Sequence, residues 1–273
     1  MKKILLLIFL FWPFFIGAEA NVVFSNLNPK QGETVFVKFL SESLVPDSVT
    51  FDKEVISSFV YQNRVVALFG IAPNKNPGVY EFKAKMKNGG VFVKNISVKK
   101  KLFPKVVLGI PEDLGLTPDE LLSGLSKENS ELNKIFEGKT EDVFFQGLFA
   151  LPLVNNRKIS SVFGEIRQTG DQEIRHLGID LSANLGAVVG AINGGVVRKA
   201  YEDPIYGKTV VIDHGQGIFS IYLHLNNIMT RVGSNLKKGQ LVGLVGKTGY
   251  STAPHLHLSV KINKISVDPL SFV

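Results

Sequence analysis

The sequence contains no cysteine in its 273 residues. This absence excludes disulfides, a lipid-modified N-terminal cysteine and thiolate metal ligands. A bound metal ion would therefore need histidine, aspartate or glutamate ligands. Histidine is also scarce, with five copies in the whole chain, so the spacing of each copy is informative.

A concentrated basic segment is also missing. The formal net charge is +7, which suits an anionic partner surface, but the lysines are dispersed along the chain. The largest basic cluster is Lys99-Lys100-Lys101. Nucleic acid is therefore not an expected partner.

The first twenty residues differ in character from the rest. Met1-Lys2-Lys3 precedes an apolar run over residues 4–16, and Gly17-Ala18-Glu19-Ala20 follows it. This pattern predicts a secretory signal peptide over residues 1–20, cleaved after Ala20. The apolar run is too short to span a bilayer comfortably, so we expect no stable membrane insertion after cleavage.

Residues 21–101 alternate short β-prone runs with turn signals. The runs include residues 34–39, 65–69, 79–84 and 91–96, and Pro, Gly and Asn lie between them. This spacing predicts an all-β, sandwich-like N-terminal domain. It holds no histidine, so we expect a spacer, a cover or a binding module.

Residues 102–147 form a predicted helical linker region. Thr117-Pro118-Asp119-Glu120 has the form of a capping box, and apolar positions continue to a stop near Gly138. Gly124 and Ser126 leave open whether the region holds one helix or two. Three roles are open for this region: it joins the two domains, it packs against one of them, or it partly covers a catalytic groove.

Residues 148–273 return to β signals with glycines at the turns. Many short strands with glycine corners predict a compact antiparallel sheet structure. The chain as a whole is therefore predicted to be mainly β.

The histidines of this last region carry the chemistry. His255 and His257 lie two apart in a β-prone run, so both imidazoles should project from one face of a strand. His176 and Asp180 share a face whether their segment is extended or helical. Joined to one histidine of the pair, they supply two imidazoles and a carboxylate, a ligand set typical of catalytic zinc with one position open.

The remaining histidines are expected to have different roles. His224, together with the other member of the pair, could take a proton from a zinc-polarised water or donate to a developing oxyanion. The sequence does not divide these two roles. His214 lies in a predicted hairpin turn over residues 213–217, and a structural role is favoured for it.

These motifs, in this order, resemble the lysostaphin-type (LytM-like) zinc metallopeptidases, which cut peptide bonds in bacterial peptidoglycan. The resemblance covers roughly residues 149–273 and includes further blocks. These are Ile159-Ser160-Ser161-Val162-Phe163-Gly164, Tyr206-Gly207, Val211-Ile212-Asp213-His214-Gly215 and Gly246-Lys247-Thr248-Gly249, among others.

The resemblance implies one zinc ion per chain, bound by His176, Asp180 and His257, with catalytic roles for His224 and His255. It also implies an antiparallel β metallopeptidase domain over residues 148–273 with the metal in an open groove. Peptidoglycan is the implied partner, and both endopeptidase and carboxypeptidase activity remain open.

Two local features depart from the shortest members of the family. Ala253 replaces a glycine that usually precedes Pro-His-Leu-His, which matters only if that position needs a positive φ. Residues 165–175 are longer than in the shortest members and predict a loop beside the groove.

Other functions compete with this interpretation. A relative that has lost the metal and activates a cell-wall amidase would share the fold, but it would not need all five of these ligand and catalytic residues. Residues 232–243 also resemble the turns of lipoyl and biotinyl carriers, which have no use for the placed histidines. We expect the protein to be exported to the periplasm of a Gram-negative bacterium. A separate hypothesis is that residues 21–148 inhibit the enzyme and keep it latent.

Overall fold

The computed structural model describes residues 18–19, 21–110, 114–138, 140–153 and 158–272. The predicted signal peptide therefore lies outside the described residues, apart from Ala18–Glu19. Within the described residues strands dominate, as the sequence predicted, and no helix is both long and apolar enough to cross a membrane.

Two antiparallel sheets make up the N-terminal part. One has the order β1 (Ala18–Glu19), β2 (Val22–Phe24), β3 (Thr34–Phe39), β7 (Arg64–Gly70) and β6 (Ser57–Tyr61); the other has β5 (Glu54–Val55), β4 (Pro46–Phe51), β8 (Gly78–Met86) and β9 (Val91–Val98). Their alternating apolar residues share one core, in which Phe24 meets Phe82 edge to face at 5.0 Å between ring centroids.

The middle of the chain holds one continuous helix, α1 (Pro118–Glu137). The predicted capping box is present, because Thr117 Oγ1 accepts from the Glu120 amide and Glu120 Oε2 accepts from the Thr117 amide. Before the helix, β10 (Lys105–Val107) pairs in parallel with β12 (Ile166–Thr169), which forms a hairpin with β13 (Gln172–Arg175).

The C-terminal part is built on one large antiparallel sheet. Its order is β11 (Ile159–Ser161), β14 (Ile179–Ser182), β21 (His255–Ile262), β18 (Ile218–Ile228), β17 (Gly207–Gly215), β16 (Gly195–Asp203) and β19 (Asn235–Leu236), with β15 (Val188–Gly190), β20 (Leu241–Val245) and β22 (Ile265–Val267) attached. A 3-10 turn, η2 (Pro269–Ser271), follows β22.

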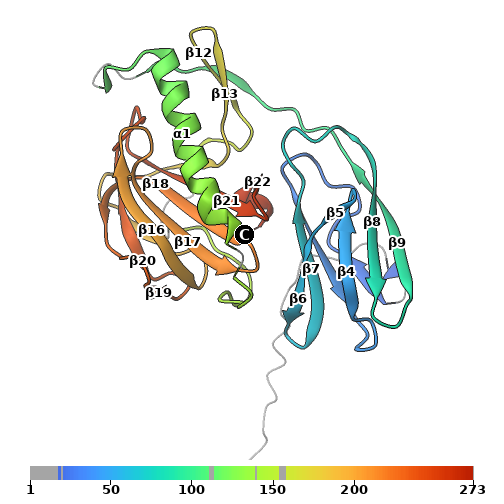
Figure 1. The fold of residues 1–273 in the computed structure, drawn as a ribbon. Helices are drawn as coiled ribbons and strands as arrows, with labels where there is room; N and C mark the ends of the chain where they lie inside the picture. The colour runs from blue at the N-terminus through green and yellow to red at the C-terminus, as the bar shows by residue number, and fades with distance from the viewer. Residues whose placement is uncertain (1–17, 20, 111–113, 139, 154–157, 273) are drawn as a thin grey trace, which may run out of the picture.

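Alternation along β18 separates the two faces of this sheet. Tyr222 points into the large core, whereas Phe219, Ile221 and Leu223 point toward α1. Phe136 of the helix meets Phe219 at 5.0 Å between ring centroids. Figure 1 shows α1 lying across this face of the sheet.

The same face carries the candidate site. Leu223 lies opposite His257, and Phe219 lies opposite Lys261, in the pairing of β18 with β21. Directly opposed residues of an antiparallel pair project to one side. The helix and the histidines therefore share one face of the sheet.

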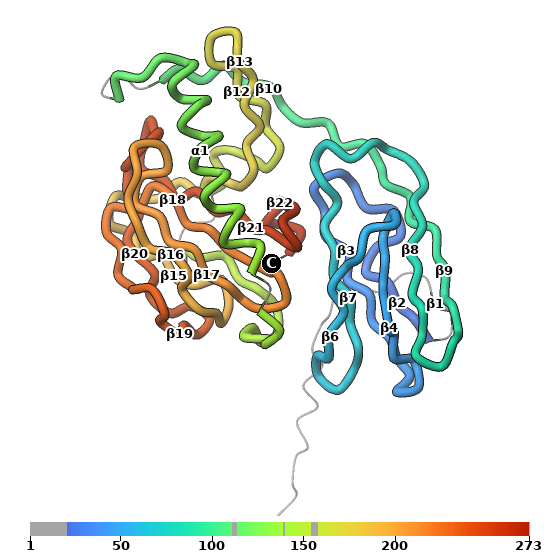
Figure 2. Tube along the Cα trace, in the orientation of Figure 1, coloured from blue at the N-terminus to red at the C-terminus, as the bar shows by residue number. Residues whose placement is uncertain are grey.

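The two parts of the chain contact each other through β6 and β7. Tyr61 stacks on Phe145 at 5.3 Å, and its hydroxyl accepts from the amide of Gly147. Ser57 donates to Asn263 Oδ1 at 2.9 Å. Figure 2 shows the chain leaving this N-terminal part and reaching β10, which lies beside the hairpin of β12 and β13.

Candidate active site

Three predicted ligands converge on the groove face of the sheet. The distance from His176 Nε2 to Asp180 Oδ1 is 3.0 Å, and His257 Nδ1 lies 2.9 Å from each of these two atoms. Asp180 and His257 lie directly opposite each other on the neighbouring strands β14 and β21, and His176 lies between β13 and β14. Tetrahedral zinc ligands at bond lengths of 2.0–2.1 Å lie roughly 3.3 Å apart, so the triangle is close to the size that such an ion requires.

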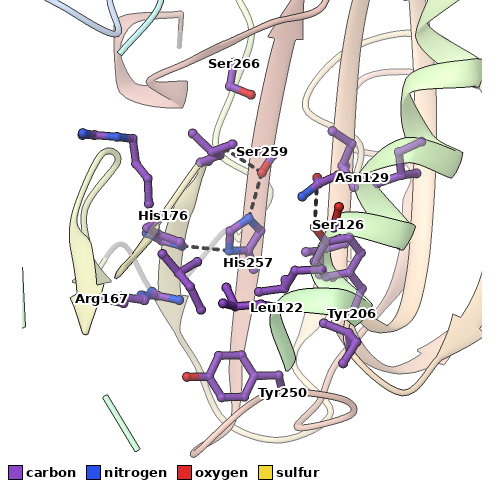
Figure 3. Close-up of a pocket in the computed structure, with 18 of the residues that line it drawn as sticks. Leu122, Ser126, Asn129, Arg167, His176, Tyr206, Tyr250, His257, Ser259 and Ser266 are labelled. Carbon is purple, nitrogen blue, oxygen red and sulfur yellow. Dashed lines mark hydrogen bonds between the residues drawn. The ribbon is translucent and has the colours of Figure 1, made fainter. Parts of the chain in front are cut away.

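Hydrogen bonds on the far side of each ring fix its tautomer. His176 Nδ1 lies 2.9 Å from the carbonyl of Val162, which can only accept, so this nitrogen carries the proton. Ser259 donates to the carbonyl of Leu177, so its oxygen accepts from His257 Nε2 at 2.8 Å. Figure 3 shows the contacts of His257 with His176 and Ser259.

These tautomers direct two imidazole lone pairs and a carboxylate oxygen at one point. Three acceptors with no proton between them repel one another unless a cation lies among them. The set of two nitrogens and one oxygen suits zinc, and the outer hydrogen bonds orient the rings as in other histidine metal sites. The residues therefore fit a single divalent metal ion.

The protonation states agree with this fit. His176, Asp180 and His257 are all buried. Burial lowers the pKa of His257 to about 4, so this imidazole is neutral, the form that binds a metal ion, at neutral pH.

A glycine allows the close packing beside His257. A Cβ added at Gly178 would lie 2.5 Å from His257 Nε2 and 2.7 Å from Ser259 Oγ. Any side chain at this position would push the imidazole away from its serine. The glycine between His176 and Asp180 is therefore part of the site.

His224 and His255 lie next to this triangle. Their ring centroids are 4.9 Å apart, and His255 Nε2 is 3.7 Å from Asp180 Oδ1. Each Nδ1 donates to a backbone carbonyl, that of Thr248 for His224 and that of Ala253 for His255. Both rings therefore present an unprotonated Nε2 when neutral.

The backbone at His224 is unusual. Its φ is 61°, which is uncommon for a residue other than glycine and costs on the order of 1 kcal/mol. Its amide donates to the carbonyl of Tyr206 at 3.0 Å, which fixes this conformation. Burial, followed by the neighbouring His255 and His257, lowers the pKa of His224 to about 3.

Arg167 is a component that sequence reasoning did not single out. The predicted loop over residues 165–175 is mostly the hairpin of β12 and β13, and it brings this side chain to the site. Arg167 Nη2 donates to Asp180 Oδ2 at 2.5 Å, and Nε donates to Glu165 Oε1 at 3.1 Å. The length of this segment was visible in the sequence, but the contact of Arg167 with Asp180 was not.

Two cavities flank the candidate metal site. The larger, about 380 Å³, lies between α1, the β12–β13 hairpin and strands β18 and β21. The smaller, about 180 Å³, is lined by residues of β11 and β14 and by residues 250–255. Arg167 and Tyr250 line both cavities, and Figure 3 shows both residues beside the histidines.

Helix α1 therefore forms one wall of the groove, as one of the three open possibilities for this region anticipated. Leu122, Leu125 and Ser126 line the larger cavity. Asn129 Oδ1 accepts from the Tyr206 hydroxyl at 3.0 Å. The helix also packs against the sheet, so it serves both as wall and as cover.

Two further expectations concern single residues. His214 lies at the end of β17 rather than in the turn, where it is fully buried and donates from Nδ1 to the carbonyl of Gly194. This placement is structural, since the side chain faces the core cluster beside Phe149. Ala253 is not among the residues with positive φ, so alanine is tolerated there.

One segment of the chain matches a family model. Residues 174–269 match the model of Peptidase family M23. The matched segment contains all five predicted site residues, which are His176, Asp180, His224, His255 and His257.

Curated relatives match over the same region. The DD-carboxypeptidase/endopeptidase Mpg of Neisseria meningitidis is 40% identical over 121 residues, 44% of this chain and 28% of the relative. The peptidoglycan DD-endopeptidase ShyC of Vibrio cholerae is 34% identical over 115 residues, 42% of this chain and 25% of the relative. The match thus spans about a quarter of the length of each relative.

A solved structure matches over both parts of the chain. It is described as a putative peptidase M23 from Pseudomonas aeruginosa, with a TM-score of 0.68 and 26% sequence identity. The match covers 90% of this chain and 95% of that chain. The similarity in fold therefore extends beyond the segment that carries the histidines.

Proposed function

Since this chain contains a domain of Peptidase family M23, we propose that it is an exported zinc metallopeptidase that hydrolyses peptide bonds in the stem peptides or cross-links of peptidoglycan. One observation carries the proposal: His176, Asp180 and His257 direct three unprotonated donor atoms at one point. The similarity to the DD-carboxypeptidase/endopeptidase Mpg and the peptidoglycan DD-endopeptidase ShyC supports peptidoglycan as the substrate.

His176, Asp180 and His257 would hold the zinc ion. Zinc would supply Lewis acidity, which polarises a peptide carbonyl and makes water acidic enough to attack it near neutral pH. The chain contributes the orientation of its ligands through Val162, Ser259 and Arg167. These contacts hold the donor atoms in place before substrate arrives.

His224 and His255 would move the protons of the reaction. Each holds its Nδ1 proton on a backbone carbonyl and offers Nε2 toward the groove. One can accept a proton from the attacking water at Nε2 and then donate it to the nitrogen of the leaving amine. The other can donate to the developing oxyanion once its Nε2 is protonated. Burial excludes bulk water from His224 and strengthens its electrostatic interactions.

The groove would hold the substrate across the candidate metal site. The larger cavity borders His176, His224 and His257, and the smaller borders Asp180 and His255, so a peptide that crosses the candidate metal site can enter both cavities. This arrangement suits an endopeptidase, while removal of a terminal residue needs only one of the two cavities. The signal sequence predicted at residues 1–20 supports export to the compartment that holds this substrate.

The test is digestion of intact peptidoglycan by the purified protein without residues 1–20. Products are separated by mass, with a chelator and the His224→Ala variant as controls. Chelator-sensitive loss of cross-linked muropeptides supports an endopeptidase, and loss of a terminal residue alone supports a carboxypeptidase. An unchanged product pattern with no zinc bound would overturn the proposal in favour of an activator of a cell-wall amidase.

A further inference from the structure

Strand β21 continues away from the candidate metal site as part of the groove floor. Its alternate residues His255, His257, Ser259 and Lys261 project to one face, and the last three line the larger cavity. A strand rises about 3.4 Å per residue, so Lys261 lies roughly 13 Å along the strand from His257. One groove thus connects the candidate metal site to this lysine.

The Lys261 ammonium group has no acidic partner among the described residues. Its Nζ donates to Ser266 Oγ at 2.9 Å and lies 5.3 Å from the centroid of the Phe136 ring. Ser266 lies directly opposite it in the pairing of β21 with β22. In Figure 3, Ser266 marks the end of the cavity opposite Tyr250.

A partly buried cation of this kind is costly unless a counter-charge reaches it. Burial lowers the pKa of Lys261 to about 8, which leaves the ammonium group protonated at neutral pH. The nearest lysine along the chain differs, because Lys264 is exposed and lies 3.7 Å from Glu137. Lys261 is therefore a cation of the cavity lining that a ligand would meet.

The charges around the cavity favour an acidic ligand. Arg167, Arg175 and Lys261 line it, whereas its lining acid Glu173 is paired with Lys105 outside. Arg167 is already engaged by two carboxylates, and Arg175 lies over the Phe103 ring. The opposite wall is mostly apolar, with Leu122, Leu125 and Leu132 of α1 beside Ser126 and Asn129. The cavity thus combines an apolar wall with an uncompensated positive charge at its far end.

We propose that Lys261 forms a substrate subsite that binds a carboxylate of an acidic peptide, roughly 13 Å along the groove from the candidate metal site. The proposal rests on the proposed peptidase function and names a determinant of its specificity. Ser266 positions the ammonium group, and the apolar wall of α1 excludes water from the ion pair. Substrates with a carboxylate at this distance from the scissile bond bind more tightly than the corresponding amides.

The test compares a cross-linked muropeptide with the same compound after amidation of its free carboxylates. Binding is measured by calorimetry in the zinc-loaded His224→Ala background, in which we expect turnover to be about 10²- to 10⁴-fold slower. Hydrogen bonds to charged groups contribute about 1.5–3 kcal/mol, which converts to about a 10- to 100-fold preference in Kd for the carboxylate form. Adding Lys261→Met should bring this ratio close to one, and Lys261→Arg should restore part of it.

Lys264→Met is the matched control, because it removes a lysine of the same hairpin outside the cavity and should leave the ratio unchanged. Equal binding of the two compounds, or a ratio that persists in the Lys261→Met variant, would overturn the subsite. Cleavage by the otherwise unmodified protein is measured in parallel. A carboxylate preference that depends on Lys261, without cleavage of either compound, would instead contradict the peptidase function and leave the subsite standing.

Discussion

The guanidinium group of Arg167 donates from Nη2 to Oδ2 of Asp180 at 2.5 Å, while Oδ1 of that carboxylate faces His176 and His257. Asp180 therefore has one oxygen for the arginine and one for the candidate metal. Arg167 also compensates Glu165, which is buried and accepts from Ser161 as well. One arginine thus balances two buried carboxylates beside the metal site.

Replacement of this arginine should destabilise the zinc-free protein more than the zinc-loaded protein. Arg167→Met leaves two buried carboxylates without their cation, and breaking such buried pairs costs about 3–5 kcal/mol. Zinc supplies a positive charge to Asp180, so we expect a clearly smaller loss when the metal is bound. The measurement is urea unfolding with a chelator and with excess zinc.

Two variants complete this comparison. Arg167→Lys keeps a cation and should lose less stability than Arg167→Met. Arg64→Met removes an exposed ion pair with Glu42 in the N-terminal part and should change stability by less than about 1 kcal/mol. Equal losses for Arg167→Met with and without zinc would show that the arginine and the metal do not share Asp180.

The sequence predicted features that depend on local pattern. Strand alternation placed His255 and His257 on one face, and the spacing of Thr117 and Glu120 predicted the helix start that the structure contains. Both rest on a fixed repeat of the backbone, which can be read from a few consecutive residues. The mainly β class followed from the same kind of signal.

Features that depend on pairing between distant segments were not accessible in this way. The contact of Arg167 with Asp180 needs the hairpin of β12 and β13 to fold over the sheet, and β10 supports that hairpin through a parallel pairing. The role of α1 as a groove wall stayed open because an apolar stripe does not specify which sheet face it covers. Ser259 could have been found, since it lies two residues after His257 on the same strand face.

The ligand assignment predicts a separation between metal binding and activity. His176→Ala and His257→Ala each remove one of three donor atoms, so zinc content should fall from about one ion per chain to near zero. His224→Ala should keep its zinc and lose activity by about 10²- to 10⁴-fold, because it removes a proton-transfer group only. Metal analysis after dialysis is compared with muropeptide digestion. Full zinc retention in His257→Ala would show that the assignment is wrong.

Helix α1 should act as a fixed wall of the groove. Leu121, Leu132 and Phe136 are buried, and detaching three such side chains costs about 6 kcal/mol at about 2 kcal/mol each. Because the chain has no cysteine, a single engineered disulfide can lock the helix in place. A Cβ at Gly124 would lie 2.7 Å from Ile205 Cγ1, so Gly124→Cys with Ile205→Cys brings the two β carbons within reach of a disulfide.

The oxidised double variant should digest muropeptides within about twofold of its reduced form, since a wall need not move. Each single cysteine variant serves as a control for the substitutions themselves. Activity that appears only after addition of a reductant would contradict a fixed wall. That outcome would support the hypothesis that residues 21–148 hold the enzyme latent.

The buried His214 should make stability depend on pH below about 6.5. Burial lowers its pKa to about 4 from the ordinary value of 6.5. The unfolded chain therefore binds a proton at a pH where the folded chain does not, and stability is lost as the pH falls from 6.5 toward 4. At pH 5 the loss from this group is about 2 kcal/mol. Urea unfolding in the presence of a chelator, at pH 7.5 and at pH 5.0, measures this loss of stability. The His214→Gln variant should be less stable than the original protein at pH 7.5 but should lose less stability on acidification. The other buried histidines titrate in both proteins and cancel in the difference, so equal losses in the two would mean that His214 is protonated in the folded state.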